Sequence, residues 1–124
     1  MDARLSSGLT LAYIGDAFYE LTVRKYFVNL GLTKVDDLHK RVINYTCAEH
    51  QSKTVKYMLE NNLLSEEEIT IFKRGRNSNT NKTRKSLSKA DYNNATGFES
   101  LIGFLHLTNQ DERAIDLINI AVTL

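Results

Sequence analysis

The sequence contains no proline in 124 residues, and helix starts recur along its whole length. Short runs of alternating apolar and polar residues, which are typical of strands, are missing. The clearest helix start is Ser65, which is followed three residues later by Glu68 in a capping-box arrangement. The sequence therefore predicts an all-α fold, in which residues 1–124 form one domain with a core of its own.

Apolar periodicity places the helices along the chain. The first helix is expected over about residues 7–30, because Gly31 is a favoured residue just past a helix end. Later helices are expected to start at Thr33, Thr46, Ser65, between Asp91 and Asn94, and at Asn109. The inward-facing residues are expected to be Leu11, Ile14, Phe18, Leu21 and Val28 in the first helix, Phe98, Leu101, Ile102 and Leu105 in the fifth, and Ile115, Ile118 and Val122 in the last.

The first predicted helix carries more apolar residues than one face can bury. Those outside the predicted stripe are Tyr13, Tyr19, Val23 and Phe27. Exposed aromatic residues on a small protein indicate a partner surface, and two-fold homodimers are the commonest solution. The sequence therefore predicts a helical bundle that forms a homodimer through this face.

Two carboxylates lie four residues apart in the most apolar part of this helix, at Asp16 and Glu20. This spacing places them one turn apart on the same face, where like charges repel by roughly a few tenths of a kcal/mol. Glu20 could pair with Arg24, four residues further along the chain. Asp16 could take part in a structural ion-pair network or belong to a cation site, and its sequence neighbourhood leaves both open.

Glu99 is the only aspartate, glutamate, lysine or arginine between positions 95 and 107, in an otherwise mostly apolar predicted helix. A buried carboxylate needs a partner, since leaving it unpaired is costly. The partner could be a lysine or arginine from another helix, or a divalent cation shared with Asp16. Oxygen ligands favour Mg²⁺ or Mn²⁺ over zinc. A metal at such a site could activate a bound water molecule.

Residues 73–89 contain seven basic residues and no acidic one, so a basic polar loop is expected at about 73–90. A solvated charge run and a phosphate-binding segment both fit this composition. Because no tryptophan is present and Tyr92 is the only aromatic residue nearby, a nucleic-acid duplex is favoured over stacked single strands. The candidate residues for binding its phosphates are Lys73, Arg74, Arg76, Asn77, Lys82, Arg84 and Lys85, together with His39, Lys40 and Arg41 from a second basic turn.

Cys47 is the only cysteine, which excludes an intrachain disulfide and favours a reducing, cytoplasmic setting. No apolar run approaches the length of a membrane span, and the N-terminus lacks the layout of a signal peptide. No membrane association is therefore expected.

Two blocks of the sequence resemble the signatures of the ribonuclease III family. These are Leu-Ala-Tyr-Ile-Gly-Asp-Ala at 11–17 and Phe-Glu-Ser-Leu-Ile-Gly at 98–103. The small bacterial branch of this family, Mini-ribonuclease III, is the most similar. It also has counterparts of Asp-Leu-His-Lys at 37–40 and Phe-Lys-Arg-Gly-Arg-Asn at 72–77. The blocks occur in the order of the family and span most of the chain.

The resemblance implies a ribonuclease III endonuclease fold, a homodimer, and Mg²⁺-dependent hydrolysis of double-stranded RNA to 5′-phosphate and 3′-hydroxyl ends. Asp16 and Glu99 would then be the catalytic and metal-binding residues, and Tyr13 would pack into a socket of the other subunit. The substrate implied is the precursor of large-subunit ribosomal RNA, with a ribosomal protein or the pre-ribosome as a further partner. The basic loop would replace the separate RNA-binding domain of larger relatives.

The sequence departs from the larger enzymes at two positions of their metal site. Ala12 stands where they have glutamate, and Thr96 stands where they have aspartate. Thr96 could contact a metal only through water, so Asp16 and Glu99 would be the only direct carboxylate ligands. A non-catalytic helical module that binds duplex RNA, or one that binds only protein, would carry similar surface features and stays open at this stage.

Overall fold

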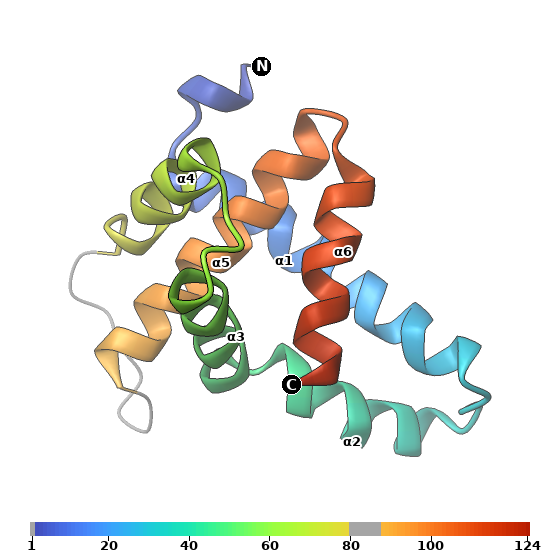
Figure 1. The fold of residues 1–124 in the computed structure, drawn as a ribbon. Helices are drawn as coiled ribbons and strands as arrows, with labels where there is room; N and C mark the ends of the chain where they lie inside the picture. Colours follow the sequence, from blue (N-terminus) through green and yellow to red (C-terminus); the bar gives the residue numbers. More distant parts are fainter. Residues whose placement is uncertain (1, 80–87) are drawn as a thin grey trace.

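The structure, a computed structural model, describes residues 2–79 and 88–124, and its regular elements in these ranges are all helical. The elements in chain order are η1 (Ala3–Leu5), α1 (Gly8–Asn29), α2 (Val35–Thr46), α3 (Ala48–Glu60), α4 (Glu66–Arg76), α5 (Lys89–Leu107) and α6 (Asp111–Thr123). The predicted all-α fold is confirmed (Figure 1). Within the described ranges, every helix is too short or too polar to cross a bilayer.

Helix α5 is the central element of the fold. It runs diagonally through the molecule in Figure 1 and packs mainly against α1, α4 and α3. Residues 95–98 and 100–105 of this helix are all buried, which leaves Glu99 as the one partly exposed residue between them. A helix that is apolar on every side belongs in the core, and the surrounding helices supply the covering layers.

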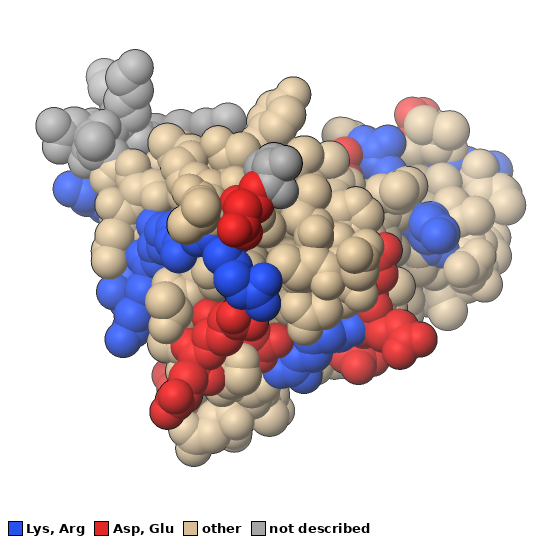
Figure 2. Space-filling model, turned by 90° about the horizontal axis from the view of Figure 1, so that it is seen from above, with Lys and Arg blue, Asp and Glu red and all other residues tan. Residues whose placement is uncertain are grey.

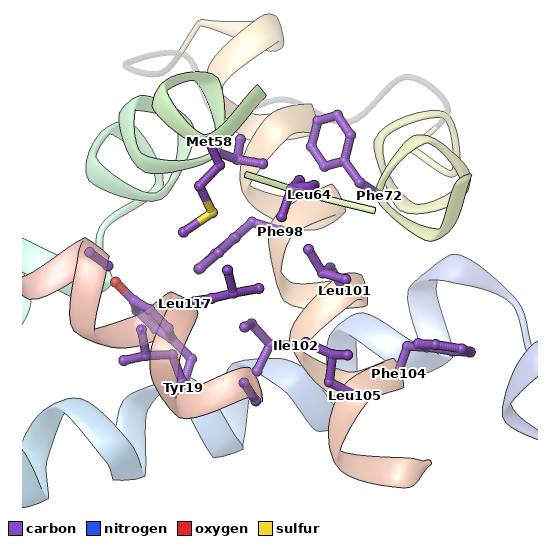
Figure 3. Packing of buried hydrophobic residues seen from close by; sticks show 14 of the residues in the cluster. Tyr19, Met58, Leu64, Phe72, Phe98, Leu101, Ile102, Phe104, Leu105 and Leu117 are labelled. Atoms are coloured by element: carbon purple, nitrogen blue, oxygen red, sulfur yellow. The ribbon is translucent and has the colours of Figure 1, made fainter. Parts of the chain in front are cut away.

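The core is built around the four apolar residues of α5 that the periodicity predicts, and all four are buried as expected. Figure 3 shows Phe98 facing Met58 of α3, with Tyr19 of α1 and Leu117 of α6 below them. The rings of Tyr19 and Phe98 meet edge to face, with centroids 5.4 Å apart. Side chains from distant parts of the sequence therefore converge on α5.

The predicted core stripe of α1 is right at Leu11, which is fully buried, and wrong at its later positions. Leu21 and Val28 are 57% and 49% exposed, whereas Ile14 and Phe18 are only partly buried. The buried residues recur every fourth position instead, at Leu11, Gly15, Tyr19, Val23 and Phe27. Because α1 is apolar on nearly all sides, its periodicity cannot identify the inner face. That face is decided by the glycine that lets α5 approach.

Two smaller predictions about the helices are also corrected. The capping box at Ser65 is present, but α5 begins after Ser88, earlier than the predicted range of 91–94. Ile115 of α6 is 39% exposed, whereas its predicted partners Ile118 and Val122 are buried. Ser88 accepts a hydrogen bond from the Asp91 backbone N–H, so an ordinary N-cap determines this earlier start.

The backbones of α1 and α5 cross in direct contact at Gly15 and Gly103. A Cβ atom on Gly15 would overlap the Glu99 carbonyl group, and one on Gly103 would overlap the Leu11 carbonyl oxygen. Glycine is required at both positions because no side chain fits between the helices. The crossing therefore brings the residue after Gly15 next to the turn of α5 that precedes Gly103.

Candidate active site

The helix crossing brings together the two acidic residues that the sequence singles out. Asp16 directly follows Gly15, and Glu99 lies one turn before Gly103. The Asp16 carboxyl group lies close enough to the Glu99 carboxyl group to raise the pKa of Glu99. Asp16 is exposed to solvent and Glu99 is only partly exposed, so the pair forms a site that opens to the surface at Asp16.

A third residue, Gln51 of α3, completes the surroundings of Glu99. Its side-chain Nε2 donates to Glu99 Oε2 at 3.4 Å and to the backbone oxygen of Thr46 at 2.9 Å. Gln51 is only 2% exposed. The sequence analysis missed this residue, although a signal was present: Gln51 shares the apolar face of α3 with Val55 and Met58, at i, i+4 and i+7 spacing.

Burial, and then the Asp16 carboxyl group beside it, raise the pKa of Glu99 to about 8, against the hydrogen bond from Gln51. Among the residues that the structure describes, no lysine or arginine forms an ion pair with either member of this pair. The other interpretation of Asp16 and Glu99, an ion pair with a basic residue from another helix, is therefore not found among the described residues. Two carboxylates and a neighbouring amide suit a hard divalent cation that binds oxygen.

No larger set of metal ligands competes with this pair. Residues 2–79 and 88–124 hold no group of three or more histidine, cysteine or acidic side chains that could bind a metal. Glu20 pairs with Arg24 at 2.6 Å, as its spacing predicts. Glu20 is thus accounted for by an ordinary i,i+4 ion pair.

The hydroxyl group of Thr96 is already engaged. Its Oγ1 donates to the backbone oxygen of Tyr92 at 3.1 Å and accepts from Asn79 Nδ2 at 2.9 Å. Ala12 and Thr96 are both buried. Thr96 thus links α5 to the residues that follow α4.

Tyr13 lies on the exposed side of α1, one turn before Asp16. It is 81% exposed, and Leu9, four residues earlier on the same face, is also exposed. Tyr19, Val23 and Phe27, which the sequence analysis assigns to the same partner surface, are core residues instead. The Tyr19 hydroxyl donates to the Tyr45 carbonyl oxygen at 2.6 Å, which satisfies its polar end inside the core.

Comparisons with known proteins agree on one family. Residues 9–110 match the family model described as the Ribonuclease III domain. The chain belongs to the ribonuclease III family. The protein named Mini-ribonuclease 3 of Enterococcus faecalis is 46% identical over 118 residues, which cover 95% of this chain and 89% of that protein. The one of Acholeplasma laidlawii is 45% identical over 117 residues, which cover 94% and 92%.

A solved structure has the same fold. Protein FN1578 from Fusobacterium nucleatum superposes with a TM-score of 0.85 at 34% identity, over 97% of this chain and 94% of that one. Together with the family match, these relatives make the protein a ribonuclease III-family endoribonuclease.

The candidate RNA-binding residues that the structure describes fall into two separate groups. Lys73, Arg74 and Arg76 belong to the last turn of α4, and Asn77 is its C-cap. The predicted loop over 73–90 is therefore too long at its start, and α5 already begins at Lys89. Lys82, Arg84 and Lys85 lie outside the described residues. The second group, His39, Lys40 and Arg41, is exposed on α2.

The two groups lie far apart. Figure 1 places α4 and α2 on opposite sides of α5. Figure 2 shows basic and acidic side chains interspersed over one face of the molecule. The structure therefore does not bring all the candidate RNA-binding residues together.

Arg74 has an internal role. Its Nη1 donates to the backbone oxygens of Arg4 at 2.8 Å and Ser6 at 3.1 Å, which ties α4 to the N-terminal segment. The Arg76 guanidinium group lies over the Phe72 ring, 5.6 Å from its centroid, and Lys73 is exposed. Of these three residues, Lys73 and Arg76 have the freer charged groups.

The raised pKa of Glu99 predicts an unusual pH dependence of stability. The folded state binds the Glu99 proton more tightly than the unfolded state, where the pKa of Glu99 is near 4.5. The protonated side chain therefore stabilises the folded state fully below pH 4.5, and this contribution is lost as the pH rises to about 8. In metal-free buffer we expect Glu99 to lower the free energy of unfolding by up to about 1.4 kcal/mol per pH unit in this window. Urea denaturation of the wild type and Glu99→Gln between pH 5 and 9 measures the difference. If the free energy of unfolding changed with pH in the same way in both proteins, the raised pKa of Glu99 would be contradicted.

Proposed function

We propose that this endoribonuclease cleaves double-stranded RNA with Mg²⁺, and that Asp16 and Glu99 are its catalytic and metal-binding residues. The observation that carries the proposal is the convergence of these two carboxyl groups, with no basic partner among the described residues. The family's general dependence on divalent metals supports it, and Mn²⁺ could replace Mg²⁺ because both prefer oxygen ligands.

The two carboxylates have different tasks in this mechanism. Asp16 is exposed, so it can hold a cation where RNA has access. Glu99 is held from behind by Gln51, and near neutral pH it must release its proton when a cation binds. When bound, Mg²⁺ would activate water and stabilise the charge that develops on the scissile phosphate. Two carboxylates leave coordination positions open for water and phosphate, so we expect tighter metal binding when RNA is present.

The resemblance to Mini-ribonuclease III supports a more specific role in the cytoplasm. We propose the precursor of large-subunit ribosomal RNA as the substrate, presented alone or with a ribosomal protein in the pre-ribosome. Residues 1–124 would act as one catalytic unit.

Amide substitutions test the catalytic pair. Asp16→Asn and Glu99→Gln keep the shape of each side chain but remove its charge. We expect each to lower the rate of Mg²⁺-dependent cleavage of a long RNA duplex at least about 1000-fold, which is about 4 kcal/mol of transition-state stabilisation. Denaturing gels measure cleavage, while circular dichroism and gel shifts should show an intact fold and intact binding.

The matched control is Glu20→Gln, one turn from Asp16 on the same helix. Glu20 is engaged in an ion pair with Arg24, so its amide variant should cleave within a few-fold of the wild type. Full activity in Asp16→Asn or Glu99→Gln would refute the assignment.

We propose that the basic residues around the end of α4 bind the duplex backbone. Replacing Lys73, Arg76, Arg84 and Lys85 by glutamine should weaken RNA binding and lower its salt dependence by about one unit of slope per lost phosphate contact. Arg74 stays unchanged in this variant because it ties α4 to the N-terminal segment. Gel shifts over a range of salt concentrations measure the slope.

A second variant separates the two basic groups. It neutralises His39, Lys40 and Arg41 on α2 and leaves the α4 side intact. If only this variant lost affinity and salt dependence, the α2 surface would bind RNA and the proposal for the α4 side would be wrong.

We also propose that the enzyme works as a homodimer with Tyr13 in its interface. Its exposed ring next to Leu9 gives an apolar row beside the proposed site, and the resemblance implies a partner socket for this aromatic. Tyr13→Ala should raise the dimer dissociation constant at least about tenfold, since burial of an aromatic ring contributes more than about 1.4 kcal/mol. Sedimentation equilibrium measures it, with Tyr57→Ala on α3 as the control. Equal dissociation constants for the two variants would place the interface elsewhere.

A further inference from the structure

Gln51 is the one buried side chain that connects the proposed site to the end of another helix. Its Nε2 donates to Glu99 Oε2 and to the carbonyl oxygen of Thr46, the last residue of α2. The final carbonyls of a helix lack partners within the helix. Gln51 therefore satisfies an end of α2 and holds the inner oxygen of Glu99 with the same amide nitrogen.

The hydrogen bonds fix the orientation of this amide. Both neighbours of Nε2 are acceptors: a backbone carbonyl oxygen and a carboxyl oxygen. Turning the amide over would point its own oxygen at both, which would lose two hydrogen bonds and create two repulsive contacts. The amide N–H groups of Gln51 therefore face Glu99, and the oxygen faces away from it.

That oxygen is a buried acceptor without a partner. Gln51 Oε1 is the one buried side-chain nitrogen or oxygen in the described residues that makes no hydrogen bond. Leaving such an acceptor unsatisfied costs roughly 1–3 kcal/mol, so native proteins normally give it water or a ligand. Oε1 belongs to the same planar amide as Nε2, and one buried water molecule on the side away from Glu99 could satisfy it.

We propose that Gln51 is a positioning residue of the active site. Its amide N–H holds the Glu99 carboxylate in the orientation that meets Asp16, and its carbonyl oxygen accepts a hydrogen bond from a buried water molecule on the side away from Glu99. The inference rests on the proposed cation site and adds a residue from a third helix. Outer partners that orient metal-ligating carboxylates typically change metal affinity by about 10–100-fold when removed.

A merely structural role for Gln51 makes a different prediction. If the amide only satisfied the end of α2, its loss would lower stability and leave metal binding unchanged. Thr54 provides a matched control on the same helix, because it is fully buried and its hydroxyl donates only to the backbone oxygen of His50. Gln51→Met and Thr54→Val each remove a buried hydrogen-bonding group and nearly preserve volume.

The test measures binding of Mn²⁺ alone to the full chain by electron paramagnetic resonance. We expect the Mn²⁺ dissociation constant to rise about tenfold in Gln51→Met and to stay within about twofold of the wild type in Thr54→Val. The Mg²⁺ concentration for half-maximal cleavage should rise by the same factor, while the rate at saturating Mg²⁺ stays within about threefold. Gln51→Leu serves as a second variant should Gln51→Met fail to fold.

The outcomes separate this inference from the proposed function. If Mn²⁺ binds the wild type and Asp16→Asn equally, or binds neither, the cation site is wrong and the role of Gln51 falls with it. If Asp16→Asn loses Mn²⁺ but Gln51→Met binds it like the wild type, only the role of Gln51 is overturned. An equal loss of affinity in Thr54→Val would also overturn it, since the effect would then come from helix α3 in general.

Discussion

The direct contact between the backbones of α1 and α5 is the constraint on which the rest of the structure depends. Gly15 and Gly103 leave no room for a side chain at the crossing. Glycine inside a helix costs about 1 kcal/mol relative to alanine, so these two positions weaken both helices. Packing between the two closely spaced helices offsets this cost. The same close approach places Asp16 beside Glu99. Fold and candidate site therefore share one structural cause.

The crossing also places two acidic side chains close together, and no lysine or arginine among the described residues pairs with them. Glu68 shows the usual solution: burial raises its pKa, but hydrogen bonds from Arg113 and the Ser65 backbone lower it by more. Glu99 has only the amide of Gln51 and another acid beside it, so its pKa rises instead. A bound cation would stabilise the ionised form of a carboxyl pair that has no basic partner more than that of a carboxylate already paired with arginine. This difference distinguishes a cation-binding site from a structural ion pair.

How far the sequence could predict these features depends on what each one needs. The all-α fold and the burial of α5 follow from local sequence, which needs no knowledge of neighbours. The inner face of α1 does not, because large apolar or aromatic residues such as Leu21 and Tyr19 lie on different sides of it, and the partner helix at Gly15 decides between them. The place of Gln51 beside Glu99 depends on the turn between α2 and α3, which brings residues 48 apart in sequence into contact. Arg74 looked like a surface charge because its acceptors are backbone oxygens of another segment.

The two departures from the larger enzymes are consistent with this packing. Ala12 and Thr96 stand where the resemblance implies further carboxylates, and both are buried. The Thr96 hydroxyl is held by Tyr92 and Asn79, so the position connects α5 with the end of the α4 segment. A carboxylate there would bring a further negative charge toward a pair that already lacks a basic partner. On the proposed assignment, the protein ligands would be two carboxylates, and the remaining coordination of a bound cation would fall to water and to the RNA phosphate.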